Sequence, residues 1–370
     1  MTVLAQDRPV STLELFFDLV FVFAITQLTS VLADDPTPIG ALRVLLIFGV
    51  LWWMFGGYVW LTNAIAPDRA VIKLLLLAAM AGFLVIALAI PTAFRSGGIV
   101  FGLAYLLVVL IHAGIFVSAI KGAGLRGILR VAPLNIVAAL VLVAAGLTGE
   151  PIVYGFWLLA LGLEVLTSFL ADPRGFRVAP GHFVERHGLL LIIVLGESIV
   201  AISVGAADLP LDASLLVAGL LALALVSCLW WLYFNEDDAR AEDALSSAPV
   251  EGRMRIALNA FFYAQIPMLL GIVAFAAGVK SAIGHAFEPL ASYGALFLAA
   301  GVALYLFGDA LFRLGIGFRD AGARLAGALA ALATFPIGVA TSASLQLAAL
   351  LAVLLVVIAV HPRRAVRFGL

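Results

Sequence analysis

The feature that most constrains this sequence is an alternation of long apolar runs with short stretches that carry the charged residues. An α-helix needs about 20 apolar residues to cross the hydrocarbon core of a bilayer, and nearly every run has about that length. The alternation therefore predicts an all-α, polytopic transmembrane bundle of about twelve spanning helices. The expected spans are 12–32, 40–63, 71–91, 99–120, 130–148, 152–171, 186–206, 212–234, 255–278, 290–308, 323–341 and 344–360.

The composition excludes several classes of protein. Hydrophobic residues make up 64% of the chain and charged residues 12%, whereas a soluble domain is about half apolar and a quarter charged. The net charge of -1 offers no basic face to a nucleic acid. The single cysteine, Cys228, forms neither an intramolecular disulfide nor a thiolate cluster, and no nucleotide-binding loop occurs. We expect a protein of the lipid bilayer that is not an enzyme and has no cofactor, no metal and no nucleic-acid partner.

Lys and Arg are distributed unevenly between the two sets of connections. All of the 21 except Arg43, Arg95 and Lys280 fall on one side of the predicted membrane. Short loops rich in Lys and Arg stay in the cytoplasm, so the sequence predicts a multi-pass inner-membrane protein with both termini in the cytoplasm. The polar first ten residues, with no small-residue cleavage site after them, predict that no signal peptide is removed.

Two pairs of matching residues indicate an internal duplication. The first span begins with Glu14 and the seventh with Glu185, and the second and eighth spans end at Asn63 and Asn235, at nearly the same offset. Six spans per half give both halves the same orientation, as in some transporter folds. We interpret the chain as two parallel six-helix halves, 1–175 and 176–370, within one integrated membrane domain.

Ionisable residues near the start of the first span are candidates for function, because charge inside a membrane is costly. Glu14 and Asp18 are four residues apart and so lie on one helical face. Glu14 is explained equally well as an acid that complements the positive end of a helix capped by Ser11 or Thr12. For Asp18, which is deeper and shorter, we expect a buried partner.

The start of the seventh span carries the densest group of ionisable residues, namely His182, Glu185, Arg186 and His187. Imidazole and carboxylate groups this close can bind a metal or pass protons. The five-residue step between the two histidines does not place them on one helical face, which argues against a metal site. A structural cluster in which Arg186 pairs with Glu185 or with Asp18 is an equal alternative.

Glu197 is the deepest acid of the seventh span. It lies about 18 Å beyond Glu185 along a helix, which is near the middle of the bilayer. Gly196 and Ser198 beside it allow close approach of a helix or a ligand. We interpret Glu197 as a proton carrier; the alternative is a neutral glutamic acid that is hydrogen-bonded to a neighbouring helix. Secondary candidates are Glu164 and His112, which we expect at similar depth, and Gln265.

Two motifs place charged residues at fixed points in apolar runs: ELFFDLVFVFAIT from Glu14 to Thr26, and HFVERHGLLLIIVLGES from His182 to Ser198. With these, and with LYLFGDALFR from Leu304 to Arg313, the sequence resembles the low temperature requirement A family of bacterial membrane proteins over essentially its whole length. The resemblance implies an all-helical integral membrane protein in a family named after a cold-growth phenotype, without a settled biochemical activity. It also implies that histidine is common where this chain has Gln265.

We predict that the chain is a secondary transporter, linked to protons, for an unknown small solute or ion. Glu197 is then the carrier, and Asp18, Glu185 and His187 form an inner gate. The alternative is a non-transporting structural or stress-response membrane protein, in which the same acids are paired to hold helices together. An enzyme that acts on lipid through the segment from His182 to His187 ranks last, because no nucleophile lies at a useful spacing from a base.

Overall fold

The structure is a computed structural model that describes residues 8–119, 123–170, 178–207, 209–235, 237–318 and 320–360. All regular secondary structure in these ranges is helical. Within them, 11 helical segments are long and apolar enough to cross a membrane, and Ile152–Thr167 is a shorter apolar helix. The predicted polytopic helical fold is confirmed.

The helices follow one another through short connections. Their bounds are α1 Thr12–Asp34, α2 Pro38–Ala64, α3 Ala70–Ala89, η1 Ile90–Thr92, α4 Gly98–Ala119, α5 Ala123–Ala145, α6 Ile152–Leu170, α7 Pro180–Ala206, α8 Ala213–Phe234, α9 Asp237–Ser247, α10 Val250–Ile256, the π-helix η3 Ala257–Tyr263, α11 Gln265–Ala282, α12 Ser292–Gly315, α13 Gly322–Ala333, α14 Phe335–Ala340 and α15 Ala343–Val360.

Several helices extend beyond the predicted spans, and α7, α12 and the ninth span are three of them. The segment α7 begins at Pro180, not at 186, because proline is tolerated in the first turn of a helix. The helix α12 continues past 308 to Gly315, because Asp309 and Arg313 are paired inside the protein and do not end the helix. The ninth span begins with α10 and η3, before the predicted start at 255. The connection before it also holds the polar helix α9.

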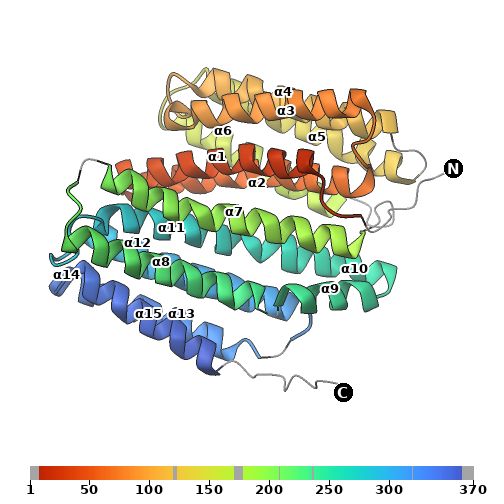
Figure 1. The fold of residues 1–370 in the computed structure, drawn as a ribbon. Helices are drawn as coiled ribbons and strands as arrows, with labels where there is room; N and C mark the ends of the chain where they lie inside the picture. Colours follow the sequence, from red (N-terminus) through yellow and green to blue (C-terminus); the bar gives the residue numbers. More distant parts are fainter. Residues whose placement is uncertain are drawn as a thin grey trace, which may run out of the picture. The chain divides into compact units, whose positions relative to one another are not determined.

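The first of two compact units comprises Met1–Glu197 and Asp238–Tyr263. In this unit α3, α4, α5 and α6 each pack against the next, and α1 packs against α2 and α3 (Figure 1). Aromatic side chains fill the space where α1 meets its neighbours. Phe21 stacks on Phe55 with ring centroids 4.1 Å apart, and Phe17 meets Phe83 edge-on at 5.3 Å. Large aromatic rings therefore anchor α1 within the unit.

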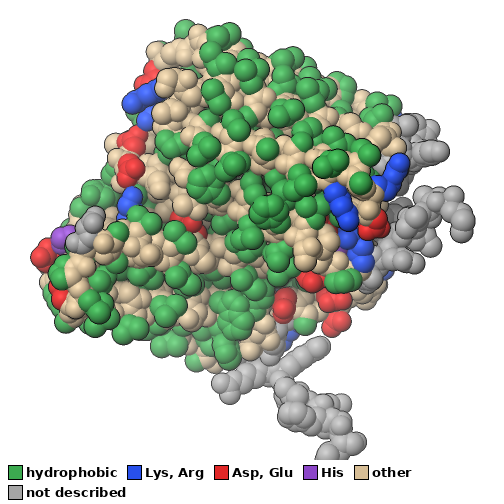
Figure 2. Space-filling view, turned by 45° about the horizontal axis from the view of Figure 1, so that its top comes forward, with side chains coloured by type: hydrophobic (Ala, Val, Ile, Leu, Met, Phe, Trp, Pro, Cys, Tyr) green, Lys and Arg blue, Asp and Glu red, His purple; other side chains and the backbone are tan. Residues whose placement is uncertain are grey.

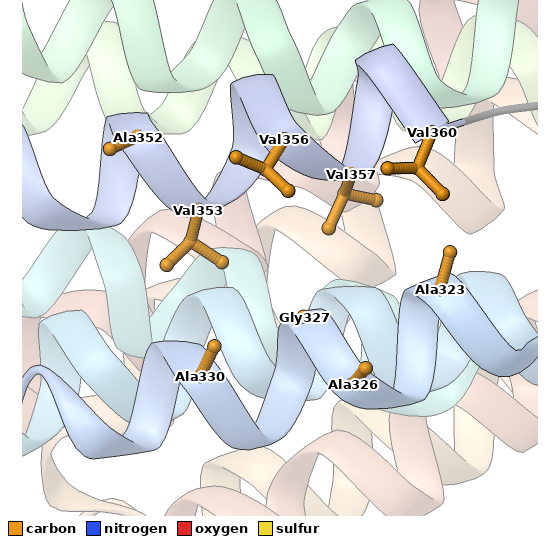
Figure 3. Close-up of a pocket in the computed structure, with 9 residues that line it drawn as sticks. All are labelled: Ala323, Ala326, Gly327, Ala330, Ala352, Val353, Val356, Val357 and Val360. Atoms are coloured by element: carbon orange, nitrogen blue, oxygen red, sulfur yellow. The ribbon is translucent and has the colours of Figure 1, made fainter.

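The second unit comprises Ser198–Asp237 and Ala264–Leu370, with α11 packed against α12, α12 against α13, and α8 against α15. Glycine allows the closest approach: a Cβ on Gly301 would lie 2.5 Å from the backbone nitrogen of Phe275. Between α13 and α15 lies an apolar groove of about 460 Å³, lined by alanine and valine side chains (Figure 3).

The two compact units do not coincide with the predicted halves 1–175 and 176–370. Helix α7 contributes Pro180–Glu197 to the first unit and its remainder to the second, and residues 238–263 return to the first unit. The duplication of six-helix halves stays a prediction.

The surface of the chain suits a bilayer. Hydrophobic side chains cover much of the face drawn in Figure 2, whereas charged side chains are sparse on it. Large apolar side chains are widely exposed; Phe169, Leu329 and Leu74 are 79%, 69% and 66% exposed. Apolar surface of this extent calls for lipid contact, so the chain is a membrane protein.

Candidate functional site

The start of α1 and the start of α7 are joined by buried charges. Ser11 caps α1: its hydroxyl accepts the N–H of Glu14, and the Glu14 carboxylate accepts the N–H of Ser11. Glu14 and Asp18 are both buried. Arg186 donates from Nη2 to Asp18 Oδ1 at 3.0 Å, and its Nη1 lies 3.4 Å from Glu14 Oε1. The buried partner expected for Asp18 is thus Arg186, which is one of the two pairings that the structural alternative left open.

A second arginine completes this cluster. Arg8 places Nη1 and Nη2 each 3.2 Å from one oxygen of Glu14, and it also donates to the Thr62 carbonyl at 2.8 Å. Arg186 donates to the Thr62 hydroxyl, and its guanidinium carbon lies 5.9 Å from the centre of the Phe17 ring. Two cations therefore neutralise two carboxylates, and α2 is tied to both through Thr62.

His182 belongs to the same cluster through its two ring nitrogens. Its Nδ1 lies 3.2 Å from the Asn63 amide nitrogen, and its Nε2 lies 3.0 Å from Glu14 Oε1. Because the amide nitrogen can only donate, Nδ1 accepts, and Nε2 is the nitrogen that carries hydrogen and donates to Glu14. The Asn63 carbonyl oxygen accepts the N–H of Ala179 at 3.1 Å, which fixes the orientation of the amide.

Glu185 and His187 lie on the same turns of α7 but have different surroundings. Glu185 is exposed and accepts the N–H of Val10 at 2.9 Å. His187 is buried, with Nδ1 2.7 Å from the Phe183 carbonyl and its ring against Phe261 at 5.2 Å. Among the described contacts, none joins either residue to Asp18, so the structure brings Glu14, Asp18, His182 and Arg186 together rather than the three residues of the expected gate.

The charges of this cluster are buried and paired with one another. Removing one member of a buried ion pair leaves an uncompensated charge, which costs about 3–5 kcal/mol. Within the described ranges, no group of three His, Cys, Asp or Glu side chains is arranged to hold a metal ion. The arrangement can keep the ends of α1, α2 and α7 together or release them when a charge is neutralised.

Glu197 has a different environment from the acids of the cluster. It is 3% exposed, and Thr26 of α1 donates to its Oε2 at 2.6 Å. Among the described contacts its side chain meets the hydroxyl groups of Thr26 and Thr29 and no cation. A carboxyl group buried without a counter-charge is stable only when it carries a proton or gains another partner. The hydrogen bond to a neighbouring helix agrees with the structural interpretation, and the lack of a cation agrees with the proton-carrying one.

The secondary candidates Glu164, His112 and Gln265 make no described contact with Glu197. Glu164 on α6 is hydrogen-bonded to the Tyr105 hydroxyl at 2.9 Å, and no described contact pairs it with His112. The Nε2 atom of His112 lies against Gly57 and makes no hydrogen bond of good geometry to a described residue. Gln265 is fully buried at the start of α11, and neither polar atom of its amide is hydrogen-bonded to a described residue.

An aromatic pocket of about 400 Å³ lies among α2, α4, α5, α6, α10 and η3, all within the first unit. Trp53 lines it, whereas its neighbour Trp52 is buried and donates from Nε1 to the Phe262 carbonyl at 3.1 Å. Hydropathy does not predict this pocket, because both tryptophans lie in one apolar run. The sequence signal is the set of polar residues His112, Asn135 and Asn259 within the predicted spans, and all three line the pocket.

A charged network in the second unit was also missed from the sequence. Arg324 donates to Asp309 at 2.7 Å, and Arg313 donates to both oxygens of Asp237 at 2.8 and 2.9 Å. Arg313 also donates to both oxygens of Asp320 at 2.9 Å. The available signal was the spacing of Asp309 and Arg313, one helical turn apart in LYLFGDALFR.

A family model and a known protein each match most of this chain. The family model described as Bacterial low temperature requirement A protein (LtrA) matches residues 9–359. A protein of Rhizobium meliloti (strain 1021), named Uncharacterized protein RA0937, is 30% identical over 310 residues, which cover 80% of this chain and 75% of that protein. No solved structure matches the chain.

Proposed function

This chain belongs to the bacterial low temperature requirement A (LtrA) family, and we propose that it works as a secondary transporter that couples a small solute or ion to a proton. Glu197 is the proton carrier in this proposal. The observation that carries it is the contrast between two kinds of buried acid on the same pair of helices. Glu14 and Asp18 are neutralised by arginine, whereas Glu197 is held by the hydroxyl of Thr26.

That contrast has a chemical consequence. An acid paired with arginine keeps its charge, because the cation offsets the cost of burial. An acid held by a hydroxyl can exchange a proton with a solute path when the helices around it move, since either protonation state of the carboxyl can accept from Thr26. Binding a proton on one side and releasing it on the other is the elementary step of proton-linked transport, and it requires no covalent chemistry and no cofactor.

The proposed orientation follows the distribution of Lys and Arg. Loops rich in these residues remain in the cytoplasm, which supports an inner-membrane location with both termini inside. The cluster of Glu14, Asp18, His182 and Arg186 then lies at the cytoplasmic ends of α1 and α7. In the proposal it replaces the gate of Asp18, Glu185 and His187, because it is the set of residues that touches across helices.

The second candidate is a structural, non-transporting role in the membrane. It is favoured by the ion pairs that neutralise Glu14 and Asp18, because these pairs connect the start of α1 to the start of α7. In that case Glu197 is a hydrogen-bonding residue, and its protonation has no role in any flux.

Proton flux into liposomes that contain the purified protein and an enclosed pH-sensitive dye separates the two candidates. Transport predicts that at least one solute of a metabolite and ion collection drives acidification with the wild type. Glu197→Gln should abolish that flux while leaving thermal stability nearly unchanged, because the glutamine oxygen still accepts from Thr26. Glu185→Gln, on the same helix but exposed, is the matched control and should retain the flux.

Two results would remove the proposal. Flux in Glu197→Gln equal to that of the wild type excludes this residue as the carrier. Absence of flux with every solute, together with a large loss of stability in Glu197→Gln, supports the structural candidate instead.

A further inference from the structure

The pocket in the first unit has the size and lining of a small-molecule site. Its volume is about 400 Å³, within the range of about 300–1,000 Å³ that ligand pockets occupy. The rings of Trp53 and Phe262 meet edge-on in its wall, with centroids 4.9 Å apart. Trp60, Phe116 and Tyr263 add further aromatic surface. Such walls favour a flat, apolar ligand body.

Two glycines and a π-helical turn create the space. A Cβ on Gly57 would lie 3.1 Å from His112 Nε2, and one on Gly56 would lie 2.5 Å from Phe262 Cε2. The π-helix η3 supplies one wall, and its Phe262 carbonyl is hydrogen-bonded to Trp52 of α2. Single π-helical turns occur often at functional sites, because they direct side chains away from the regular helical pattern.

The inner part of the pocket holds buried polar side chains from α4 and α5. His112 is 4% exposed and Asn135 is 8% exposed, and both line the pocket. Neither Nε2 of His112 nor Oδ1 of Asn135 is hydrogen-bonded to a described residue. An unpaired buried polar atom destabilises the site, and a ligand that forms a hydrogen bond with it removes that cost. The Asn135 oxygen can only accept, so the ligand must offer an N–H or O–H.

The charge at the pocket is positive. Arg255 of α10 lines it, is exposed, and makes no ion pair with a described side chain. None of the residues that line the pocket is Asp or Glu. A guanidinium group binds carboxylate with two parallel hydrogen bonds, whereas a cationic ligand would be repelled and would find no counter-charge.

We infer that this pocket binds a small aromatic or cyclic organic acid, with its anionic group at Arg255, its ring against the wall formed by Trp53 and Phe262, and a hydrogen-bond donor at Asn135. As the substrate class of the transporter, this assignment rests on the proposed function. As a binding site it stands alone, because binding is measured without any flux.

The test is ligand-induced thermal stabilisation of the purified full-length protein in detergent, since a ligand of the folded state raises its apparent stability. The probe is indole-3-carboxylate, which has an anion, a ring and an N–H. Two analogues isolate single contacts: indole-3-carboxamide lacks the charge, and 1-methylindole-3-carboxylate lacks the donor. Arg255→Gln should weaken the apparent Kd for indole-3-carboxylate about tenfold or more.

Matched variants test whether the probe binds in this pocket. Arg130→Gln removes an exposed arginine of α5 that does not line the pocket, and it should bind the probe like the wild type. In Arg255→Gln the carboxylate and the carboxamide should bind equally. Asn135→Leu should weaken indole-3-carboxylate and leave its N-methyl analogue unaffected, whereas Gly57→Val, which fills the space beside His112, should abolish binding of both.

Three outcomes overturn the inference. One is no stabilisation of the wild type by indole-3-carboxylate at millimolar concentration. Another is equal binding in Arg255→Gln and Arg130→Gln. The third is stabilisation by phosphatidylglycerol alone that depends on Arg255, which assigns the pocket to a lipid. If binding follows the expected pattern but Glu197→Gln carries normal flux, the pocket assignment survives and only the proton-carrier proposal fails.

Discussion

Arg186 is a side chain of α7 that contacts both α1 and α2. It is 1% exposed and interacts with Asp18, Glu14 and Thr62. We expect Arg186→Met to lower the free energy of unfolding by about 3–5 kcal/mol, because Asp18 is then buried without a cation. Chemical unfolding of the detergent-solubilised protein measures this loss.

A double substitution tests whether the loss comes from the uncompensated charge. In Asp18→Leu/Arg186→Met the buried carboxylate is also removed, so part of the lost stability should return. Arg130→Met is the matched control on an exposed site and should change little. Equal stability of the variants Arg186→Met and Arg130→Met would show that the buried pair does not hold these helices.

Individual residues show where sequence reasoning succeeds and where it stops. The depth of Asp18 and Glu197 in their spans follows from counting residues along a helix, and both are buried as that depth requires. The partner of each depends on which helices are neighbours and on their rotation, which hydropathy does not encode. The structure thus distinguishes Asp18 from Glu185 as the acid with which Arg186 pairs.

Helices α11 and α12 pack through glycines spaced seven residues apart, or about two turns. They are Gly271 and Gly278 on α11, and Gly294, Gly301 and Gly308 on α12. A Cβ on Gly271 would lie 2.7 Å from the Gly301 carbonyl oxygen. This spacing places the glycines on one face of each helix, where they allow the two backbones to come close.

Gly301→Ala should destabilise the protein by about 1–3 kcal/mol, because its new methyl group has no room beside the backbone of Phe275. Gly162→Ala on α6 is the matched substitution, since no atom lies within 4 Å of the added Cβ. It should be neutral or stabilising by up to about 1 kcal/mol, because alanine favours helix over glycine. Thermal unfolding of both variants measures the difference, and destabilisation of the two by the same amount would contradict close packing at Gly301.

The ends of helices were predicted less well than their existence. Apolar length identifies a span, but a charge within the last turns looks like the start of a loop. In α12 the charges of Asp309 and Arg313 are compensated by Arg324 and Asp237 from other segments, and the helix continues to Gly315. The pocket wall at η3 was missed for a related reason, because a π-helical turn has no hydropathy pattern of its own.

For the whole chain, the proposed orientation in the membrane can be tested with two single cysteines. Cys228 is replaced by serine, and one cysteine is introduced either at Ser96, between η1 and α4, or at Ser246 in α9; both positions are exposed. With cytoplasmic termini, Ser96 faces outward and Ser246 faces inward. A membrane-impermeant maleimide should label Ser96→Cys in intact cells and Ser246→Cys only after permeabilisation. The reverse pattern would invert the orientation.

The pairing of Asp18 with Arg186 also has a consequence for biosynthesis. The two residues are 168 positions apart in the chain, and a ribosome adds about 5–20 residues per second, so Arg186 is made roughly ten to thirty seconds after Asp18. Glu14 can pair with the nearby Arg8 during that interval, whereas Arg186, the partner of Asp18, is made only with α7. The first unit therefore cannot close as its early helices emerge, and any translational pause between α1 and α7 prolongs the time for which a membrane helix carries an acid without its counter-charge.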